Sequence, residues 1–236
     1  MTAVMPHVLH HQLEVLADPA QVAAAAADHV VRLSREAIAD HGRFTFAVSG
    51  GHTPWAMFAD LAERGRDVAW RHVLVFQVDE RIAPAGDPDR NLTHLRESLA
   101  ATDAEVVPMP VNDADPADAA GLAEAAEGYA ALLPDRFDVV HLGLGPDGHT
   151  ASLVPDDPVL EVTDHLVGIT RPYQGHPRMT LTYPALARAD QVLWLVTGAE
   201  KRAPLAKLLV GDQSIPAGRV EARASLILAD RAAAGR

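Results

Sequence analysis

Apolar runs of strand length alternate with longer amphipathic segments along most of the chain. The first amphipathic segment is expected to be a helix from Asp18-Pro19 to His41-Gly42, because Asp suits the N-cap, Pro the first turn and Gly the stop. Residues 43–48 then have the pattern of a strand, and a second helix is expected over residues 54–61. The chain therefore begins with a helix, strand and helix in succession.

The same alternation continues to the end of the chain. Further strands are expected over residues 72–78, 105–109, 137–142, 166–170, 179–182, 191–197 and 225–229, and further helices over residues 91–100, 115–133, 184–189 and 201–209. The strand at 105–109 is expected at a sheet edge because it contains a proline. Strands that alternate with helices predict an α/β fold with a doubly wound, mostly parallel sheet. No repeat or linker interrupts the pattern, so we expect a single domain over residues 1–236.

Composition and charge narrow the possible functions. Of the 236 residues, 48% are hydrophobic and 22% charged, as in ordinary folded domains, and no run approaches the roughly 18 apolar residues of a membrane span. The formal charge of −12 argues against nucleic acid and anionic membranes as partners, and an anionic small substrate would need a local cluster of cations. The absence of cysteine excludes disulfides and thiolate chemistry. The first twelve residues lack the pattern of a signal peptide, so we expect a cytoplasmic protein.

The most informative stretch is the glycine-rich segment at residues 143–155, which follows the apolar run at 137–142. A strand that leads into such a turn delivers side chains to the carboxyl edge of a sheet, where open α/β proteins bind ligands. Asp147 and His149 are separated by one glycine in this turn. We therefore expect the two side chains to lie together at the mouth of a cleft.

Asp147 and His149 fit a general base and its electrostatic partner. An ordinary histidine titrates near ~6.5, so a neutral imidazole is available at neutral pH and a nearby carboxylate favours the imidazolium that forms. The alternative is a polar turn in which Asp147 caps the turn and His149 is exposed. No third ligand is apparent beside these two, so no metal is expected.

Residues 143–148 also match the dinucleotide pattern Gly-x-Gly-x-x-Gly. Pro146 removes a backbone donor from this loop, the turn comes late in the chain, and no acidic residue follows a strand about 20 positions later. The sequence therefore argues against a nicotinamide cofactor.

The loop at residues 49–54 has the composition of an anion-binding turn. Gly50 and Gly51 allow close approach of the backbone to a ligand, and Ser49 and Thr53 add hydroxyl donors at a helix start. An ordinary strand-to-helix turn capped by Thr53 would have the same composition. The Lys-Ser/Thr ending of a Walker loop is missing.

Two cations are expected at the same sheet edge as these loops. Arg81 follows a strand end and Lys201 stands at the start of the last long helix. Either alone would more often be a solvated surface cation, but their shared position beside the glycine-rich turn favours anion binding. Arg178 directly precedes a strand, so the pattern does not place it at one edge or the other.

Together these segments resemble the 6-phosphogluconolactonase family. The matching pieces occur in the family's order and span nearly the whole chain: residues 49–54, Asp79-Glu80-Arg81 with Asn91, 143–152, 178–182 and 197–201. The most specific is Gly-x-Asp-Gly-His-Thr-Ala-Ser at 145–152. The resemblance implies a Rossmann-like fold, hydrolysis of 6-phospho-D-glucono-1,5-lactone to 6-phospho-D-gluconate in the oxidative pentose phosphate pathway, and no cofactor.

The resemblance also implies roles for individual residues. His149 would be the general base with Asp147 as its neighbour, and the loop at 49–54, Arg81 and Lys201 would hold the phosphate. The full set expected to contact substrate is Ser49, Gly50, Gly51, Thr53, Asp79, Arg81, Asn91, Gly148, Arg178 and Lys201. The expected partner is a phosphorylated sugar lactone, and we expect the chain to act as a monomer.

Two related functions are the alternatives. Glucosamine-6-phosphate deaminases and sugar-phosphate isomerases carry Asp-Glu-Tyr and Gly-His-Ile-Ala-Phe-Asn-Glu at the matching segments, whereas this chain has Arg81 for the Tyr and Val154 for the last Glu. Aldose–ketose chemistry needs a proton relay that is hard to build without that Glu. A non-catalytic sugar-phosphate-binding domain would be expected with a DNA-binding module or a disrupted Asp-x-His, and the sequence shows neither.

Overall fold

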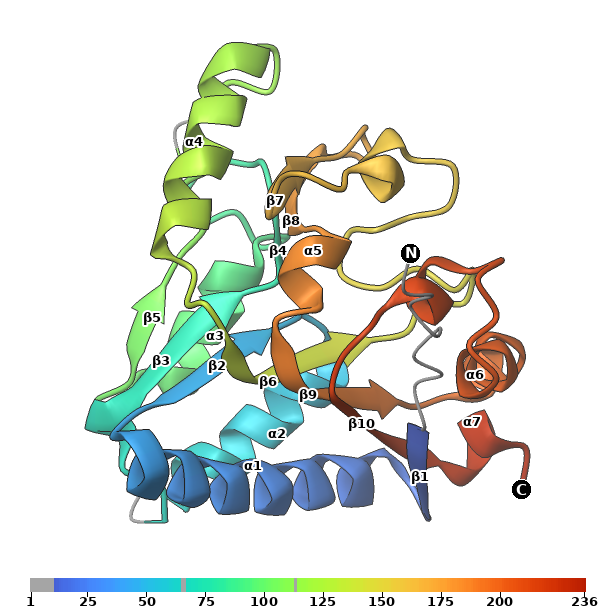
Figure 1. Ribbon diagram of the computed structural model, residues 1–236. Helices are drawn as coiled ribbons and strands as arrows, with labels where there is room; N and C mark the ends of the chain where they lie inside the picture. Colours follow the sequence, from blue (N-terminus) through green and yellow to red (C-terminus); the bar gives the residue numbers. More distant parts are fainter. Residues whose placement is uncertain (1–10, 65–66, 113) are drawn as a thin grey trace, which may run out of the picture.

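A sheet of seven parallel strands forms the centre of the computed structural model, which describes residues 11–64, 67–112 and 114–236 (Figure 1). From one edge to the other the strands are β1 (His11–Leu16), β10 (Ala224–Asp230), β9 (Ala189–Val196), β6 (Phe137–Gly143), β2 (Phe44–Val48), β3 (Val73–Gln77) and β5 (Glu105–Val107). Every pairing between neighbours is parallel. The predicted α/β class and parallel sheet are confirmed.

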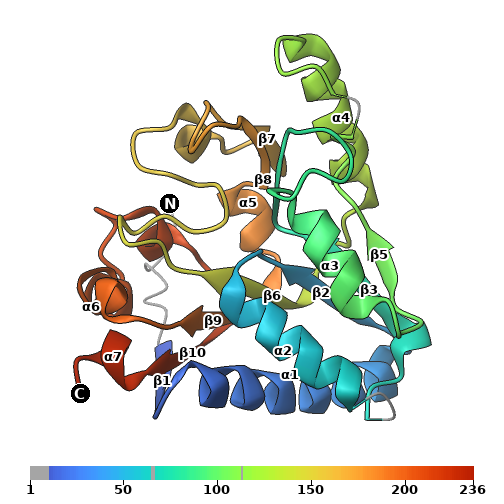
Figure 2. The ribbon, with the colours of Figure 1, turned by 180° about the vertical axis from the view of Figure 1, so that it is seen from behind.

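Helices cover both faces of this sheet. Apolar side chains of α1 (Pro19–His41), α2 (His52–Glu63) and α3 (Asn91–Leu99) pack on one face, and Figure 2 shows α2 and α3 side by side. The other face is covered by α4 (Ala119–Leu132), α5 (Tyr183–Leu186) and α6 (Arg202–Leu209). Short helical segments are η1 (Trp70–His72), η2 (Pro158–Glu161), η3 (Ala199–Lys201), η4 (Pro216–Arg219) and α7 (Arg231–Ala234). None of the helices in the described part of the chain has the length and apolar run that crossing a membrane requires.

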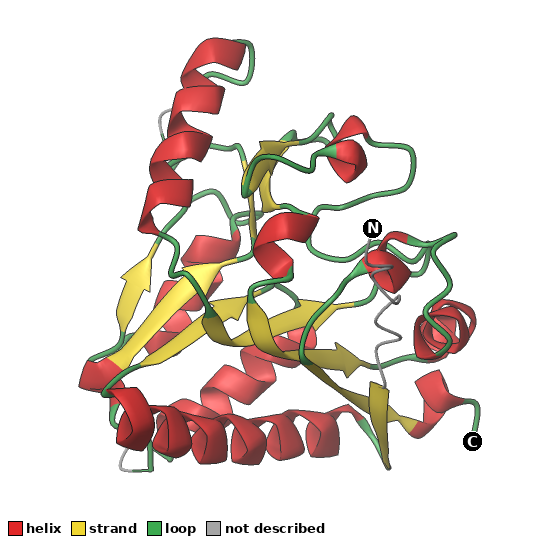
Figure 3. Ribbon diagram, in the orientation of Figure 1, coloured by secondary structure: helices red, strands yellow, loops and turns green. Residues whose placement is uncertain are grey.

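A second, smaller sheet lies on the α5 side of the large one (Figure 3). Its antiparallel strands are β4 (Asp79–Arg81), β8 (Arg178–Leu181) and β7 (Val167–Ile169). The sequence predicted β7 and β8 but treated Asp79–Arg81 as the end of the preceding strand. The chain changes sheets at Val78, whose N–H donates to Val48 O in the large sheet and whose carbonyl accepts from Leu181 N–H at the small one.

Three other elements differ from the prediction by more than two residues. Strand β1 was not predicted, because its short polar-apolar alternation is stabilised by parallel pairing with β10, more than 200 residues away. Helix α4 starts at Ala119, because Asp115 first forms a turn by accepting from Ala117 N–H (2.8 Å) and Asp118 then caps the helix. Helix α5 ends at Leu186, because the chain joins β9 three residues later.

The order of the strands creates one crevice at the carboxyl edge of the large sheet. From β2 the chain winds outward through β3 to β5, and from β6 it winds the other way through β9 to β10. Neighbouring strands β2 and β6 are therefore the point at which the winding reverses. Ligands of open α/β sheets bind at such a point. The loop after β2 and the glycine-rich turn after β6 meet there.

A buried ion pair attaches the small sheet to helix α3. Glu80 of β4 and Arg90 are almost fully buried, and Arg90 Nε lies 3.2 Å from Glu80 Oε2. The same carboxylate accepts from the first backbone N–H groups of α3, at Asn91 and Leu92 (both 2.8 Å). Glu80 therefore caps the helix while it neutralises Arg90.

We predict that Arg90→Met lowers the free energy of unfolding by about 3–5 kcal/mol, because it leaves the Glu80 carboxylate buried without its cation. Urea unfolding measures this effect. Arg96→Met, on the exposed side of the same helix, is the matched control and should leave the midpoint unchanged. Equal midpoints for the two variants would show that the ion pair does not hold the small sheet in place.

Candidate active site

A cavity of about 560 Å³ opens at the carboxyl edge of the sheet, between the loops that follow β2, β6 and β9. It also reaches the small sheet at β4 and β8. The predicted site residues on its wall are Ser49, Gly50, Gly51, Thr53, Asp79, Arg81, Asn91, His149, Arg178 and Lys201. Residues far apart in the sequence are thus brought to one cavity at the reversal of strand order.

The glycine-rich turn is tight and places Asp147 against His149. Gly145 N–H donates to His149 O (2.8 Å) and Gly148 N–H donates to Gly145 O (3.0 Å). A Cβ at Gly145 would lie 2.1 Å from His149 Nδ1 and 2.6 Å from Asp147 Oδ1. The pair can form only because residue 145 has no side chain.

Asp147 and His149 form a short hydrogen bond. Asp147 Oδ1 lies 2.5 Å from His149 Nδ1 and also accepts from the His149 backbone N–H at 3.1 Å. Burial by itself would raise the pKa of Asp147, but the bonds from His149 and its charge outweigh burial and lower that pKa. The carboxylate stays ionised and accepts a hydrogen bond from the proton on Nδ1 of His149. This tautomer leaves Nε2 as the acceptor.

The turn has features of both interpretations from the sequence, and the role of His149 as a general base stays a prediction. Asp147 does cap the turn, through the backbone of His149, yet only 20% of the His149 side chain is exposed and the residue lines the cavity. Asp147 stands behind the imidazole rather than on the cavity wall. Gly148 is also behind the wall, where its carbonyl accepts from Ala217 N–H (3.0 Å), so its contact with substrate stays a prediction.

The loop after β2 is held by a histidine that no pattern in the sequence indicated. Ser49 N–H donates to Nδ1 of His141, 3.3 Å away on β6. His141 is completely buried, and burial lowers its pKa to about 3, so it is neutral and can accept. The Ser49 hydroxyl is buried at the cavity with no hydrogen-bond partner among the described residues. It is therefore available to a ligand.

Asp79 and Asn91 connect this loop to the small sheet. Asn91 Nδ2 donates to the Asp79 carbonyl (3.0 Å), and Asp79 Oδ2 accepts from Ser152 Oγ (2.6 Å). A Cβ at Gly50 would lie only 1.9 Å from Asn91 Oδ1, so the loop can approach Asn91 only with glycine there. Asp79 and Asn91 both line the cavity, as predicted. Their hydrogen bonds connect β4 with the start of α3 and with Ser152 of the glycine-rich segment.

Three cations face the cavity. Arg178 is 4% exposed, and burial lowers its pKa while Asp79 opposes that shift. Arg81 donates to the carbonyl of Asp89, and the Lys201 ammonium lies 3.9 Å from Glu200. The buried Nε atoms of Arg81 and Arg178 have no partner in the described part of the chain. An acidic protein thus carries the local cluster of cations that an anionic substrate requires.

Aromatic residues lie on or beside the cavity wall, and nothing in the sequence pattern distinguished them from core or surface residues. Trp55 and His94 line the cavity with ring centroids 5.7 Å apart. Tyr173 contacts both His149 and Arg178 from the turn between β7 and β8. Thr197 holds the predicted Thr53 through their hydroxyl groups (2.9 Å).

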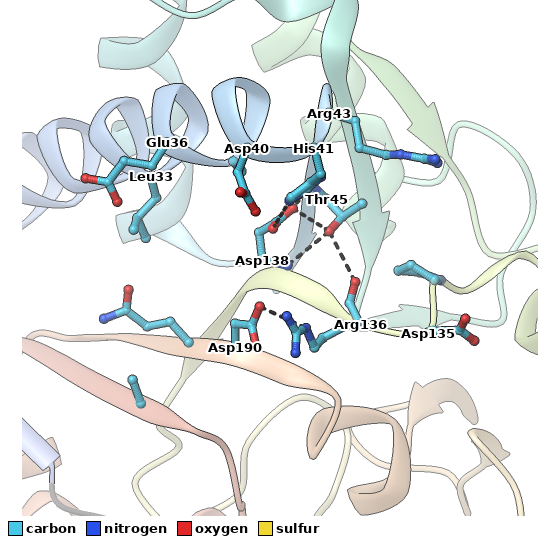
Figure 4. A pocket seen from close by; sticks show the side chains of 14 residues that line it. Leu33, Glu36, Asp40, His41, Arg43, Thr45, Asp135, Arg136, Asp138 and Asp190 are labelled. Atoms are coloured by element: carbon cyan, nitrogen blue, oxygen red, sulfur yellow. Dashed lines mark hydrogen bonds and ion pairs between the residues drawn. The ribbon is translucent and has the colours of Figure 1, made fainter.

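A larger cavity of about 810 Å³ lies at the opposite, amino-terminal edge of the sheet (Figure 4). Several of its polar groups are paired with one another. Asp138 accepts from the N–H (2.7 Å) and hydroxyl (2.8 Å) of Thr45, and Arg136 Nε lies 3.0 Å from Asp190. These bonds connect neighbouring strands, so this edge is structural.

In the described residues no group of three or more His, Asp or Glu side chains is placed to hold a metal ion.

Comparisons with known proteins agree with the fold and with the resemblance found in the sequence. A family profile described as glucosamine-6-phosphate isomerases/6-phosphogluconolactonase matches residues 17–228. A 6-phosphogluconolactonase from Synechocystis sp. is 36% identical over 204 residues, which cover 81% of this chain and 83% of the relative. The structure of 6-phosphogluconolactonase from Trypanosoma brucei superposes with a TM-score of 0.85 at 27% identity, over 96% of this chain and 98% of that one.

A monomeric glucosamine-6-phosphate deaminase also superposes, with a TM-score of 0.81 over 95% of this chain and 99% of that chain, but at 16% identity. That likeness shows the shared fold alone. Lactonases and deaminases therefore use one architecture, and the side chains of the site must separate the two activities.

The burial of His141 predicts how stability depends on pH. The unfolded chain protonates a histidine near ~6.5, whereas folded His141 resists protonation until about pH 3, so unfolding gains protons and stability falls as the pH drops between these values. His141→Asn keeps an acceptor for Ser49 N–H and should flatten this fall, as measured by urea unfolding from pH 7 to pH 4. His165→Asn, at an exposed position, is the control. Parallel curves for the His141 variant and the wild type would contradict the assignment.

Proposed function

The chain belongs to the glucosamine-6-phosphate isomerase/6-phosphogluconolactonase family, and from this premise we propose that it hydrolyses its lactone with His149 as the general base. The activity is that of a 6-phosphogluconolactonase, which converts 6-phospho-D-glucono-1,5-lactone to 6-phospho-D-gluconate in the pentose phosphate pathway. The observation that carries the proposal is the Asp147–His149 pair beside three cations at one cavity.

The geometry supports a direct attack of water on the lactone. His149 Nε2 takes a proton from a water molecule whose oxygen bonds to the carbonyl carbon, and the charge that forms on the carbonyl oxygen needs nearby donors. The bond from that carbon to the ring oxygen then breaks, and the imidazolium returns its proton to the departing oxygen. Asp147 stabilises the imidazolium and holds the tautomer. The carboxylic acid that forms then releases its proton to solvent and leaves the carboxylate, so atoms and protons balance without a cofactor in the scheme that we propose.

The phosphate has a separate part of the cavity in this proposal. Arg81 and Lys201 supply charge, and the loop from Ser49 supplies its hydroxyl and the first N–H groups of α2, with Thr53 beside them. Binding energy from the remote phosphate fixes the carbonyl near His149. We assign Asp79, Asn91 and Arg178 to the wall beside the sugar ring.

Deaminase and isomerase chemistry is disfavoured at this site. Val154 occupies the position at which the deaminase motif has Glu, and it is buried and cannot ionise. Proton transfer between C1 and C2 needs an acid/base pair in addition to the one that activates water. The side chains therefore favour the lactonase within the shared fold.

We also propose the setting in which the protein works. The wall residues of the cavity come from both halves of the chain, which supports a single domain, and we propose that this domain acts as a monomer. The absence of cysteine suits a reducing compartment, and we propose the cytoplasm. The acidic surface argues for a small phosphorylated lactone as partner, without nucleic acid or membrane.

We predict that His149→Ala lowers kcat by roughly 10²–10⁴-fold and leaves KM nearly unchanged, because only proton transfer is lost. Initial rates with freshly made 6-phosphogluconolactone, corrected for spontaneous hydrolysis, measure this effect. His165→Ala, at an exposed position, should match the wild type. In the wild type kcat/KM should fall on acidification, because a protonated ring cannot accept a proton. Near-normal turnover by folded His149→Ala would assign the base elsewhere.

For the phosphate, we predict that Arg81→Ala and Lys201→Ala each raise KM by about 10–100-fold for 6-phosphogluconolactone and change little for unphosphorylated gluconolactone. Loss of a charge-assisted contact costs about 1.5–3 kcal/mol, and only the phosphorylated substrate can lose it. Arg71→Ala removes a cation at the opposite edge of the sheet and serves as control. Equal losses with both lactones would show that these cations act at the ring or on the fold.

A further inference from the structure

The hairpin between β7 and β8 holds Tyr173 firmly against the glycine-rich turn. Tyr173 N–H donates to His176 O (2.9 Å), and the two residues between them, Gln174 and Gly175, both have left-handed φ angles of +51° and +92°. Two such residues in succession form the tight loop that matches strand twist in a hairpin. His176 Nε2 also lies 3.4 Å from Asp89 Oδ2, which ties the hairpin to the loop before α3.

Tyr173 contacts both members of the catalytic pair. Its hydroxyl donates to Asp147 Oδ2 at 3.4 Å, while Oδ1 of the same carboxylate serves His149. Its ring meets the imidazole edge to face, with centroids 5.5 Å apart and an angle of 67° between the planes. Contacts at both oxygens restrict rotation of the carboxylate away from the imidazole, and they thereby favour one tautomer and one direction of Nε2.

The hydroxyl of Tyr173 remains a donor throughout the neutral range. Burial, the charge of Asp147 and the hydrogen bond to it all raise the pKa of Tyr173, in that order, and Arg178 opposes them. On its other side the ring supports the buried cation: the Arg178 guanidinium carbon lies 5.1 Å from the ring centroid, and Nη2 donates to the Tyr173 carbonyl at 3.3 Å. One side chain therefore contacts the base, its carboxylate and a cation of the cavity wall.

We propose that Tyr173 is a positioning residue for lactone hydrolysis: its hydroxyl fixes the carboxylate of Asp147 behind His149, and its ring fixes Arg178 at the cavity wall. This inference rests on the proposed function, in which His149 is the general base. The two parts of Tyr173 have separate tasks, since the hydroxyl serves proton transfer and the ring serves the placement of a substrate-facing cation.

The two tasks predict different kinetic effects. Without the hydroxyl, Asp147 samples more orientations and the imidazole is less well aligned, which lowers kcat. The carboxylate also loses a donor that disperses its charge, so it stabilises the imidazolium more strongly and the acidic limb of the kcat/KM profile moves to higher pH. The other charged and titratable groups around the cavity are Asp79, Arg81, His94, Arg178, Glu200 and Lys201, and the substitution leaves all of them in place.

The test compares Tyr173→Phe and Tyr173→Leu with the wild type on 6-phosphogluconolactone. Tyr173→Phe should lower kcat by roughly 2–10-fold, as expected for one hydrogen bond, keep KM and shift the acidic limb upward. Tyr173→Leu should show the same effects and raise KM as well, because Arg178 loses its ring. Tyr183→Phe is a matched control: its hydroxyl donates to Pro216 O (3.0 Å) and Arg219 lies 4.8 Å from its ring, away from the cavity. It should change neither kcat nor the pH profile.

The outcomes separate this inference from the proposed function. Near-normal activity of His149→Ala would overturn the proposed function itself. If His149→Ala is inactive but Tyr173→Phe matches the wild type in kcat and in its acidic limb, the positioning role is wrong. A lower kcat with an unmoved limb and a lower unfolding midpoint would show that Tyr173 only stabilises the hairpin, and would also overturn the inference.

Discussion

The hydrogen bond between Asp147 and His149 is the interaction on which the rest of this site depends. At 2.5 Å it fixes the tautomer of the imidazole, and it exists only because residue 145 is glycine and leaves room for both side chains. The turn that carries the pair is in turn anchored at the end of β6, the strand beside the reversal of winding in the sheet. This short contact therefore depends on the sheet topology and on the turn geometry, and it sets which imidazole nitrogen carries the proton.

The cavity gathers positively charged side chains, although the protein as a whole is acidic. The chain carries a formal charge of −12, yet Arg81, Arg178 and Lys201 converge on one cavity with a buried, unpartnered serine hydroxyl among the described residues. Buried contacts escape the screening that limits surface fields to roughly 8 Å at physiological salt. Remote binding of a phosphate and proton transfer at a carbonyl can therefore be separated within one cavity. Tyr173 connects the Asp147–His149 pair with the cavity wall at Arg178, because it contacts both Asp147 and Arg178.

Local signals predicted the fold correctly and pointed to loops that lie together at one cavity. The caps at Asp18 and Gly42, the apolar strands and the glycine-rich turns are all features of short sequence windows, and the sheet edge that they imply gathered the predicted loops. Contacts between distant residues could not be predicted in this way. Strand β1 depends on pairing with β10, and the small sheet forms because the chain changes sheets at Val78, directly after β3. His141 is one polar residue in an apolar strand, and its hydrogen-bond partner Ser49 lies 92 positions away in the sequence. Tyr173 likewise acquires its contacts only when a hairpin folds over the turn.

This member of the family is expected to catalyse the attack of water on a lactone and not the proton transfer between C1 and C2 that its deaminase relatives need. The most direct measurement follows two substrates with one purified sample, by proton release from 6-phosphogluconolactone above the spontaneous rate and by NMR of glucosamine 6-phosphate in deuterated water. We expect rapid lactone hydrolysis, and we expect the amino sugar to be recovered with no ammonia released and no deuterium at C2. Ammonia release or deuterium at C2, without accelerated lactone hydrolysis, would contradict this expectation.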